Sequence, residues 1–567
     1  MSPRPAARRE IGAKDQAIGA SLALAYVALL LVTAPAIGLS RDEGIYAIAA
    51  DQYGAWFRLL ATEPSVAMTK EAIDAHWAFN HEHPALMKSL FALSANAQAA
   101  WSIFPRPSLA YRFPAMVIAG LLLWLVYIFG ARTFGRQPGV FAAVAFALLP
   151  RVFYHAHLDC FDVPIVFFTT LTTYCYWRSL SRRSWAVPTG LAFGLALATK
   201  HNAWLLPIVF AIHFAWMAIA ERAERRATGR ERIELVPYGL LAMAVLGPVV
   251  FVGSWPWLWH DTVPRLREYA AFHLHHEYYN MAYFGVNYFR PPFPISYPFV
   301  MTLFTVPTTV LALGLLALAS RAYAIVPYPL TRLFPVSLQV RRDSRATDVL
   351  LVGCMLAPIV VIALPSTPIF GGTKHWFPSY PFLCLYAGYG AQRTVRTLRD
   401  ALRTALPDAR LVVRLGAAGV LLLPSLAETM RSHPFGLSHY VYAAGGVPGS
   451  ADKGMNRQFW GFTTRSLAPF FRRHLPDGGR IWICDTLPHS FEMLKRDGHL
   501  PVNVTIASTM AEADYVIVHH EHHFAEVEGQ AWVVFDSVRP AYVLTHEGVP
   551  IITVYENPTR RARHVPR

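Results

Sequence analysis

Long apolar runs, separated by short polar segments, make up most of the first 428 residues of this 567-residue chain. A helix needs about 20 consecutive apolar residues to cross the hydrocarbon core of a bilayer. The runs that could form such helices are 16–39, 110–131, 139–157, 162–179, 186–199 (the shortest), 202–220, 235–256, 296–320, 348–365, 376–392 and 411–428. The pattern predicts an α-helical polytopic membrane protein with about 11 transmembrane helices.

Basic residues are distributed unevenly among the polar segments. They cluster in RPAARRE, RSLSRR, ERAERRATGRER, RRDSR and RTVRTLRDALR, whereas residues 40–109 contain only five Lys or Arg. Because Lys and Arg accumulate in cytoplasmic loops, the N-terminus is predicted to be cytoplasmic. The run 16–39 is longer than the apolar core of a signal peptide, about 7–15 residues, so it is expected to remain as a helix. We therefore predict a multi-pass protein of the cytoplasmic (inner) membrane.

Residues 429–567 differ from the rest and have the pattern of a soluble domain. RIWICDT, ADYVIVHH, AWVVF and PIITVYE are short β-rich runs. TTRSLAPFFRRHL and SFEMLKRDG have helical spacing. We predict a transmembrane domain, 1–428, with a first outer loop at 40–109 and a second near 257–295. A small extracytoplasmic (periplasmic) α/β domain, 429–567, follows it.

Composition agrees with the membrane assignment. Hydrophobic residues make up 54% of the chain and charged residues 15%, against about 25% charged residues in soluble proteins. The net charge is +15, but the basic residues are not interleaved with aromatic ones as in nucleic-acid-binding domains. No nucleic-acid partner is predicted. The five cysteines form no CxxC pair, so neither a disulfide framework nor a cysteine metal site is indicated.

Two adjacent acids stand where the chain leaves the first apolar run, in the stretch GLSRDEGIYA. In a helix beginning here, Asp42 and Tyr46 share one face and Glu43 lies beside them. A partly desolvated carboxylate can accept a proton from a substrate hydroxyl. Alternatively, the acids only favour the N-terminal dipole of an interfacial helix.

Other ionisable residues lie at the predicted outer ends of the apolar runs. FNHEHPALMKSL in the first outer loop carries Glu82, His83 and Lys88; LLPRVFYHAHLDCFDVP carries Arg151, His155, His157, Asp159 and Asp162; LALATKHNAW carries Lys200; and FGGTKHWFPSYP carries Lys374 and His375. Ionisable residues at membrane depth are costly and mark functional sites, although each one alone could extend its charge to the interface. Their placement on one side of the membrane predicts a common site.

Acids combined with cations suit transfer from a phosphate-bearing donor. Cations stabilise the leaving phosphate, and an acid activates the acceptor. A lipid-linked phosphate would bring its head group to this depth, whereas a soluble nucleotide donor is not indicated, because no Walker-type loop is present. The histidine runs HLHHE (273–277) and HHEHH (519–523) could bind zinc. For the second run, a loop at a strand end is the simpler explanation.

These stretches resemble the glycosyltransferase C (GT-C) superfamily, specifically the family 39 group of protein O-mannosyltransferases and lipid A aminoarabinose transferases. RDEGIYA resembles the acidic motif of the first outer loop, and HEHPALMKSL the His-Pro-Pro-Leu-x-Lys stretch. PRVFYHAHLDCFDVPIVFF and ALATKHNAWLLP resemble the segments that bear the family's arginine, aspartate and lysine. SHYVYAAGGVPGSADKGMNRQFWGF resembles a tail segment of bacterial members, with Trp-Gly-Phe in place of Trp-Gly-Glu.

The resemblance implies an inverting transfer of a monosaccharide from a polyprenyl-phosphate donor to an acceptor, which is a protein, a glycolipid or a polysaccharide. No cofactor is implied and no divalent metal is expected. The expected roles are general base for Asp42, orientation for Glu43 and Tyr46, phosphate binding for Lys88, Arg151 and Lys200, sugar-pocket shape for Glu82, His83 and Asp162, and substrate contact for Lys374 and His375.

Two other functions are compatible with parts of the pattern. A transporter or flippase of a lipid-linked saccharide would explain the apolar runs and the charges among them, but not the acid-rich first outer loop. An adhesion or assembly protein would use its outer domain for binding, yet an anchor does not need so many spans. Both remain alternatives to the transferase.

Overall fold

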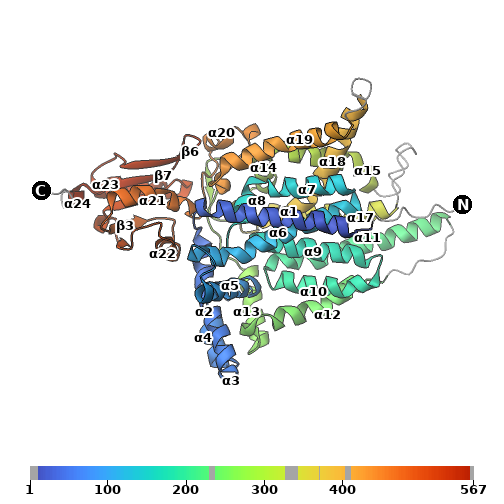
Figure 1. Ribbon diagram of the computed structural model, residues 1–567, viewed down its shortest axis with the longest axis horizontal. Helices are drawn as coiled ribbons and strands as arrows, with labels where there is room; N and C mark the ends of the chain where they lie inside the picture. Colours follow the sequence, from blue (N-terminus) through green and yellow to red (C-terminus); the bar gives the residue numbers. More distant parts are fainter. Residues whose placement is uncertain (1–9, 229–235, 326–341, 370, 402–409, 562–567) are drawn as a thin grey trace.

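The computed structural model describes residues 10–228, 236–325, 342–369, 371–401 and 410–561. Most of these residues are helical, and a small sheet lies in the C-terminal part. In Figure 1 the long helices run side by side along the long axis, and the sheet lies beyond one end of them. The chain therefore has a helical bundle and a sheet-containing region at one end of it.

Each predicted apolar run contains a helix or a pair of helices. The helices of the bundle are α1 (Ala13–Thr33), α6 (Pro107–Thr133), α7 (Arg136–Ala147), α9 (Asp162–Ser179), α10 (Ala186–Leu197), α11 (Leu205–Thr228), α12 (Tyr238–Gly253), α15 (Thr308–Ile325), α17 (Arg342–Ala363), α18 (Tyr380–Ala401) and α19 (Arg410–Ser432). Two runs are broken. The run 139–157 forms α7 and the short α8 (Pro150–His155), and the run 296–320 forms α14 (Tyr297–Thr305) and α15, bent by 119°.

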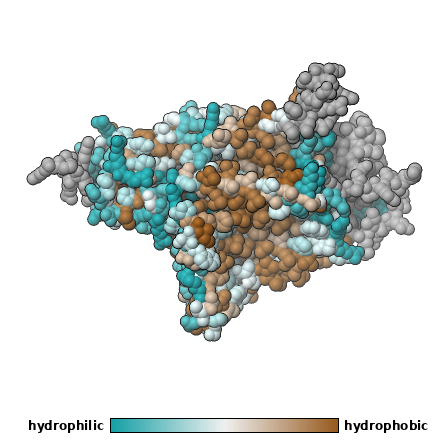
Figure 2. Space-filling view, viewed as in Figure 1, coloured by the Kyte–Doolittle hydropathy of each residue, from teal (hydrophilic) through white to brown (hydrophobic). Residues whose placement is uncertain are grey.

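Four of the described helical spans are long and apolar enough to cross a membrane alone: Ala13–Ala36, Pro107–Thr133, His201–Ala223 and Arg345–Ala363. The bent pair α14 and α15 would make a fifth. A broad apolar band covers the bundle between two hydrophilic ends (Figure 2). The protein is therefore a multi-pass membrane protein, while the count of about 11 spans stays a prediction.

Residues 40–109, which are predicted to be the first outer loop, are mostly helical. They form α2 (Arg41–Thr62), α3 (Pro64–Ala67), α4 (Lys70–Trp77) and α5 (Leu86–Trp101). Glu43 helps to start α2, because its carboxylate accepts a hydrogen bond from the Ser40 N–H at 2.7 Å. In Figure 1, α2 and α4 run across the end of the bundle. The second loop forms α13 (Thr262–Leu274) and a hairpin, β1 (Met281–Tyr283) and β2 (Val286–Tyr288).

The C-terminal sheet has five strands in the order β4–β3–β5–β7–β6. The strands are β3 (Gly479–Ile483), β4 (Val504–Ile506), β5 (Tyr515–His519), β6 (Tyr542–His546) and β7 (Val549–Glu556). Strand β3 is parallel to β4 and β5, whereas β7 is antiparallel to β5 and β6. The expected sheet region is thus present.

One expected strand is wrong. AWVVF forms the end of helix α23 (Ala525–Phe535), because Ala531 and Phe535 lie one turn apart and are both buried against the domain core. The segments expected to be helical are confirmed as α21 (Ala468–His474) and α22 (Pro488–Arg496).

Helix α22 packs directly on α2, so the C-terminal region contacts the first outer loop. The contact is close at Gly44, where an added Cβ atom would lie 2.5 Å from the backbone nitrogen of Ser490. The Ser490 hydroxyl donates to the carbonyl oxygen of Ser40 at 2.9 Å. The predicted boundary at 428/429 falls inside α19, which continues to Ser432, and the division into two domains stays a prediction.

Candidate active site at the end of the helix bundle

Asp42 is the second residue of α2 and faces a lysine from a distant part of the chain. Its Oδ2 atom lies 3.3 Å from Nζ of Lys374, which belongs to the 3-10 segment η6 (Gly372–Ser379). The Asp42 side chain is 25% exposed, while that of Lys374 is 7% exposed. Burial opposes the charge of Lys374, but the carboxylates of Asp42 and Asp162 outweigh it and raise its pKa. The pair is thus an acid open to solvent beside a buried cation.

Two consecutive glycines allow η6 to approach this site. Gly371 and Gly372 have φ values of 66° and 67°, in the left-handed region that favours glycine. A Cβ atom on Gly371 would also lie 2.1 Å from the ring of Trp460. The tight turn therefore places Lys374 under an aromatic side chain from the C-terminal region.

A second ion-pair group lies where α8, α9 and α10 end or begin. Asp162, the first residue of α9, accepts a hydrogen bond from Nζ of Lys200 at 2.7 Å. Its other carboxylate oxygen is 3.2 Å from Nδ1 of His155. All three side chains are at most 8% exposed. Charges buried to this extent need partners. Here the Asp162 carboxylate is the partner of both Lys200 and His155.

Arg151 is a further buried cation on α8. Its guanidinium donates to the carbonyl oxygen of His439 through Nε at 3.3 Å and Nη2 at 3.2 Å. The rings of Tyr440 and Phe459 lie 5.0 and 5.4 Å from the guanidinium carbon. Among the described residues, nothing accepts a hydrogen bond from its buried Nη1, which faces Gly372. Arg151 therefore has donor capacity left for an anion.

Glu43 has a different environment from Asp42. It is 1% exposed, and its two oxygens accept from Nε and Nη2 of Arg112 at 2.7 and 3.0 Å. The backbone N–H of Asp159 lies 3.4 Å from one of them. Burial favours the neutral acid, but the Arg112 guanidinium outweighs it and holds the pKa of Glu43 low. Burial and the Glu43 charge raise the pKa of Asp159 well above its usual range. Glu43 thus anchors α2 and its oxygens are already occupied.

The HEHPALMKSL stretch forms the turn before α5 and the start of that helix. Nζ of Lys88 donates to the carbonyl oxygens of Asn80 at 2.5 Å and His83 at 2.8 Å, so Lys88 fastens this turn. Burial lowers the pKa of Lys88 to about 7. Glu82 accepts from the Asn80 side-chain amide at 2.6 Å. The Lys88 side chain therefore stabilises the backbone of this turn. Among the described residues, no carboxylate forms an ion pair with its ammonium group.

His83 and Tyr46 lie together on the side of α2 that bears Asp42. Their rings are 5.8 Å apart and nearly perpendicular, and Phe161 packs on Tyr46 at 4.3 Å. Burial, together with the charge of Lys88, lowers the pKa of His83 well below its usual value. Burial therefore favours the neutral form of the His83 imidazole. His375 is buried in η6, and its carbonyl oxygen accepts from the Asn202 amide at 3.3 Å.

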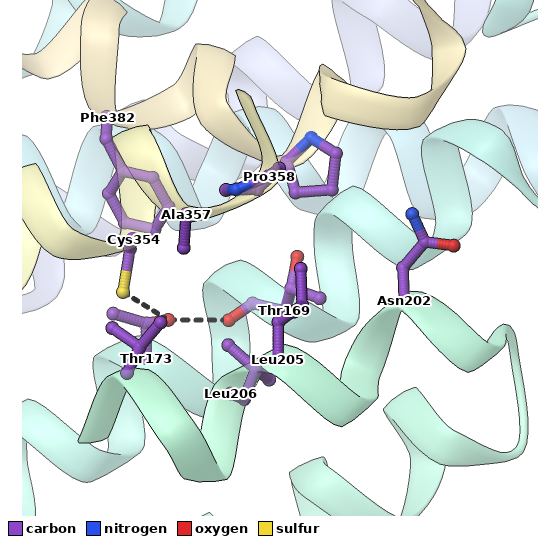
Figure 3. A pocket seen from close by; sticks show the side chains of 11 residues that line it. Thr169, Thr173, Asn202, Leu205, Leu206, Cys354, Ala357, Pro358 and Phe382 are labelled. Atoms are coloured by element: carbon purple, nitrogen blue, oxygen red, sulfur yellow. Dashed lines mark hydrogen bonds between the residues drawn. The ribbon is translucent and has the colours of Figure 1, made fainter. Parts of the chain in front are cut away.

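A small, mostly apolar cavity of about 20 Å³ adjoins this group between α9, α11, α17 and α18 (Figure 3). Thr169 and Thr173 line it from α9, and Asn202 lies at its edge. Since Thr169 is seven residues after Asp162, the cavity lies about 10 Å further along the same helix. A cavity of this size holds about one water molecule. It marks a gap between bundle helices next to the charged cluster.

The structure thus brings together side chains expected from five separate stretches, and it adds some that had no assigned role. Arg112, a single arginine in a predicted span, gave no signal beyond its own charge. His155 and Asp159 stood in a quoted stretch without a role. Trp460 and Tyr440 lie in the tail, where nothing in the sequence tied them to cations. Within the described ranges, no group of three or more His, Cys, Asp or Glu side chains could hold a metal ion.

Apolar helices with acids and cations collected at one end define a membrane protein with a polar site at the edge of its helix bundle. Residues 83–252 match the family model described as dolichyl-phosphate-mannose-protein mannosyltransferase. Over this segment the chain is similar to a family of membrane mannosyltransferases, in agreement with the resemblance drawn from its motifs. A sequence search of curated proteins found no match.

Several solved structures are similar over most of the chain at low identity. ArnT from Cupriavidus metallidurans bound to undecaprenyl phosphate is 14% identical, with coverage of 96% of this chain and 98% of that one and a TM-score of 0.45. The apo oligosaccharyltransferase of Archaeoglobus fulgidus is 11% identical, covers 92% and 70%, and has a TM-score of 0.48. The arabinofuranosyltransferase AftD from Mycobacteria is 12% identical, covers 97% and 40%, and has a TM-score of 0.43.

Proposed function

We propose that this protein transfers a monosaccharide from a polyprenyl-phosphate donor to an acceptor at the outer face of the cytoplasmic membrane. The observation that carries the proposal is the pairing of a solvent-accessible acid, Asp42, with the buried cation Lys374. Asp162–Lys200 and Arg151 lie in the same cluster. This arrangement offers a base on one side and cations for a phosphate on the other.

The proposed reaction is a single displacement. The Asp42 carboxylate takes the proton of an acceptor hydroxyl or amine, and the acceptor atom attacks the anomeric carbon of the sugar. The bond from that carbon to the phosphate oxygen breaks, and its electron pair leaves with the polyprenyl phosphate. Because attack and departure occur on opposite sides, the anomeric configuration inverts. A positioned general base contributes about 10²–10⁴-fold in rate.

Three cations would stabilise the leaving phosphate, and they differ in how many partners each would have to give up in order to bind it. Arg151 has an unsatisfied buried nitrogen, so it can bind an anion without giving up a partner. Lys374 and Lys200 are held by carboxylates, and a phosphate would compete with these for the ammonium groups. Lys88, whose ammonium is engaged by backbone carbonyls, is assigned to loop shape instead. No metal ion is required by this scheme.

The remaining side chains are assigned to the substrate pocket. Tyr46 and the neutral His83 would contact the sugar or the acceptor beside Asp42, since both lie on its side of α2. Glu82 and Asp162 would shape the same pocket, and His375 would contact the substrate from η6. Glu43 supports α2 through Arg112. The acceptor is a protein, a glycolipid or a polysaccharide.

The membrane arrangement completes the proposal. About 11 spans, a cytoplasmic N-terminus and an extracytoplasmic domain formed by residues 429–567 would place the cluster at the outer surface of the inner membrane. The isoprenoid tail of the donor would lie along the apolar band of the bundle. The head group would then meet the cations at the bundle end.

The test is transfer by the purified full-length protein in proteoliposomes. Polyprenyl phosphates bearing different radiolabelled sugars are supplied with total membrane extract, and label is measured in protein, glycolipid and polysaccharide fractions. The proposal predicts label in one fraction, undiminished by a chelator. No transfer from any donor, combined with movement of the lipid-linked sugar across the bilayer, would favour a flippase instead.

A further inference from the structure

The segment His439–Trp460, which leads into the C-terminal sheet, surrounds two of the cations described above. The Lys374 ammonium lies over the face of Trp460, 4.1 Å from the ring centroid. The Arg151 guanidinium carbon lies 5.0 Å from the ring centroid of Tyr440 and 5.4 Å from that of Phe459. A cation over an aromatic face is attracted by the negative face of the ring, and the attraction is larger away from water. Each of the two buried cations is thus held by rings from the C-terminal segment.

The Trp460 ring is fixed from several sides. Trp460 has a φ of 61°, a left-handed conformation that is rare for a large side chain. Its carbonyl oxygen accepts a hydrogen bond from the backbone N–H of Arg41 at 2.9 Å, the residue immediately before Asp42. The ring packs on Gly371 and stands perpendicular to His155 at 5.5 Å. One residue therefore contacts both the start of α2 and the turn that carries Lys374.

Hydrogen bonds connect this segment to the C-terminal sheet. The side-chain amide of Gln458 donates to the carbonyl oxygen of Ile551 in β7 at 2.8 Å. The Tyr440 hydroxyl donates to the carbonyl oxygen of Asn456 at 2.7 Å, which fixes the ring beside Arg151. All of these side chains are buried. The segment that contacts the two cations is therefore attached to strand β7 of the C-terminal sheet.

We propose that Tyr440, Phe459 and Trp460 are positioning residues of the transfer site. They hold Arg151 and Lys374 where the donor phosphate arrives, so the C-terminal region is part of the catalytic unit and not an independent binding domain. This inference rests on the proposed function. Beyond the proposed function, we expect that loss of one of these rings weakens phosphate binding, because the cation that the ring contacts is no longer held in position. The rings themselves do not touch the reacting atoms.

The experiment measures binding of a polyprenyl phosphate without a sugar to the full-length protein in nanodiscs. Trp460→Leu removes the ring face, Trp460→Phe keeps an aromatic face, and Trp532→Leu is a control in α23 of the same region. We expect Trp460→Leu to weaken binding about 3- to 30-fold, the range of a partly to fully desolvated cation–π contact. Trp460→Phe should recover most of the affinity, and Trp532→Leu should match the wild type.

A double-mutant cycle separates positioning from general damage. If Trp460 acts through Lys374, then Trp460→Leu adds little to the loss caused by Lys374→Met alone. Independent, fully additive losses would overturn the inference, and so would unchanged binding in Trp460→Leu. Should Trp460→Leu fail to fold, Phe459→Leu and Arg151→Met provide the equivalent cycle. If the wild type does not bind the polyprenyl phosphate, the proposed function and this inference fall together. If Lys374→Met weakens binding but Trp460→Leu does not, only this inference falls.

Discussion

The buried pair of Glu43 and Arg112 is the contact that holds the start of α2 in place, and its removal makes a sharp prediction. Both side chains are at most 3% exposed, and they share two hydrogen bonds of 2.7 and 3.0 Å. Arg112 also donates to the carbonyl oxygen of Gly38 at 2.6 Å. Arg112→Met leaves the Glu43 carboxylate buried without its counter-ion and leaves that carbonyl oxygen without its donor.

Breaking one partner of a buried ion pair costs about 3–5 kcal/mol, because the remaining charge has neither water nor a partner. In a protein of this size we expect the apparent midpoint of thermal unfolding to fall by about 3–4 °C at pH 7. Removing both charges in Glu43→Gln/Arg112→Met should recover a large part of that loss, since no unpaired charge stays buried. The assay is intrinsic fluorescence during heating of the purified protein in detergent.

The pH dependence should reverse between the two proteins. In the wild type the pKa of Glu43 is held low, so its contribution to stability is present above the unfolded pKa of about 4.3 and is lost as the pH falls. In Arg112→Met burial is unopposed and raises this pKa, so lowering the pH from 7 toward 5 should stabilise that variant relative to the wild type. A variant with the wild-type midpoint, or a double variant no more stable than Arg112→Met, would refute the reasoning.

Two further predictions concern the first outer loop. Burial lowers the pKa of Lys88 to about 7, whereas the pKa of lysine in the unfolded chain is about 10.4. Because the unfolded state binds more protons between these two pKa values, the stability of the protein should rise with pH over this range. Unfolding midpoints measured across a pH series should show this rise in the wild type and not in Lys88→Met. Gly44→Ala should destabilise the protein despite the better helix propensity of alanine, because its Cβ would lie 2.5 Å from the Ser490 backbone; Gly419→Ala in α19, with open space around it, is the control and should be neutral or stabilising in the same assay.

Local sequence patterns predicted the elements better than they predicted the site. Each apolar run contains a helix, because burial in lipid demands internal backbone hydrogen bonds. The bend at Pro307 was not expected, since apolar periodicity does not show where a helix bends. AWVVF was expected to be a strand from its composition, yet packing of Ala531 and Phe535 makes it helical. Tertiary contacts decided both cases.

The candidate site shows the same division. Charges at the ends of apolar runs are visible in the sequence because they are costly there, and Asp42, Arg151, Asp162, Lys200 and Lys374 were found in this way. Which cation meets which acid was not visible, because Lys374 and Asp42 are 332 positions apart. Backbone carbonyls accept the hydrogen bonds of Lys88, and aromatic rings lie around Arg151 and Lys374. Both arrangements depend on the geometry of loops, which no periodic pattern in the sequence predicts. The roles of these residues in transfer stay predictions.

The most direct measurement is sugar transfer by Asp42→Asn in proteoliposomes supplied with the donor that the wild type uses. The account predicts a loss of about 10²–10⁴-fold in turnover, with the protein still inserted and folded, whereas Glu63→Gln, which changes an exposed acid just after the same helix, keeps full activity. Turnover of Asp42→Asn close to that of the wild type would contradict the assignment of Asp42 as the base.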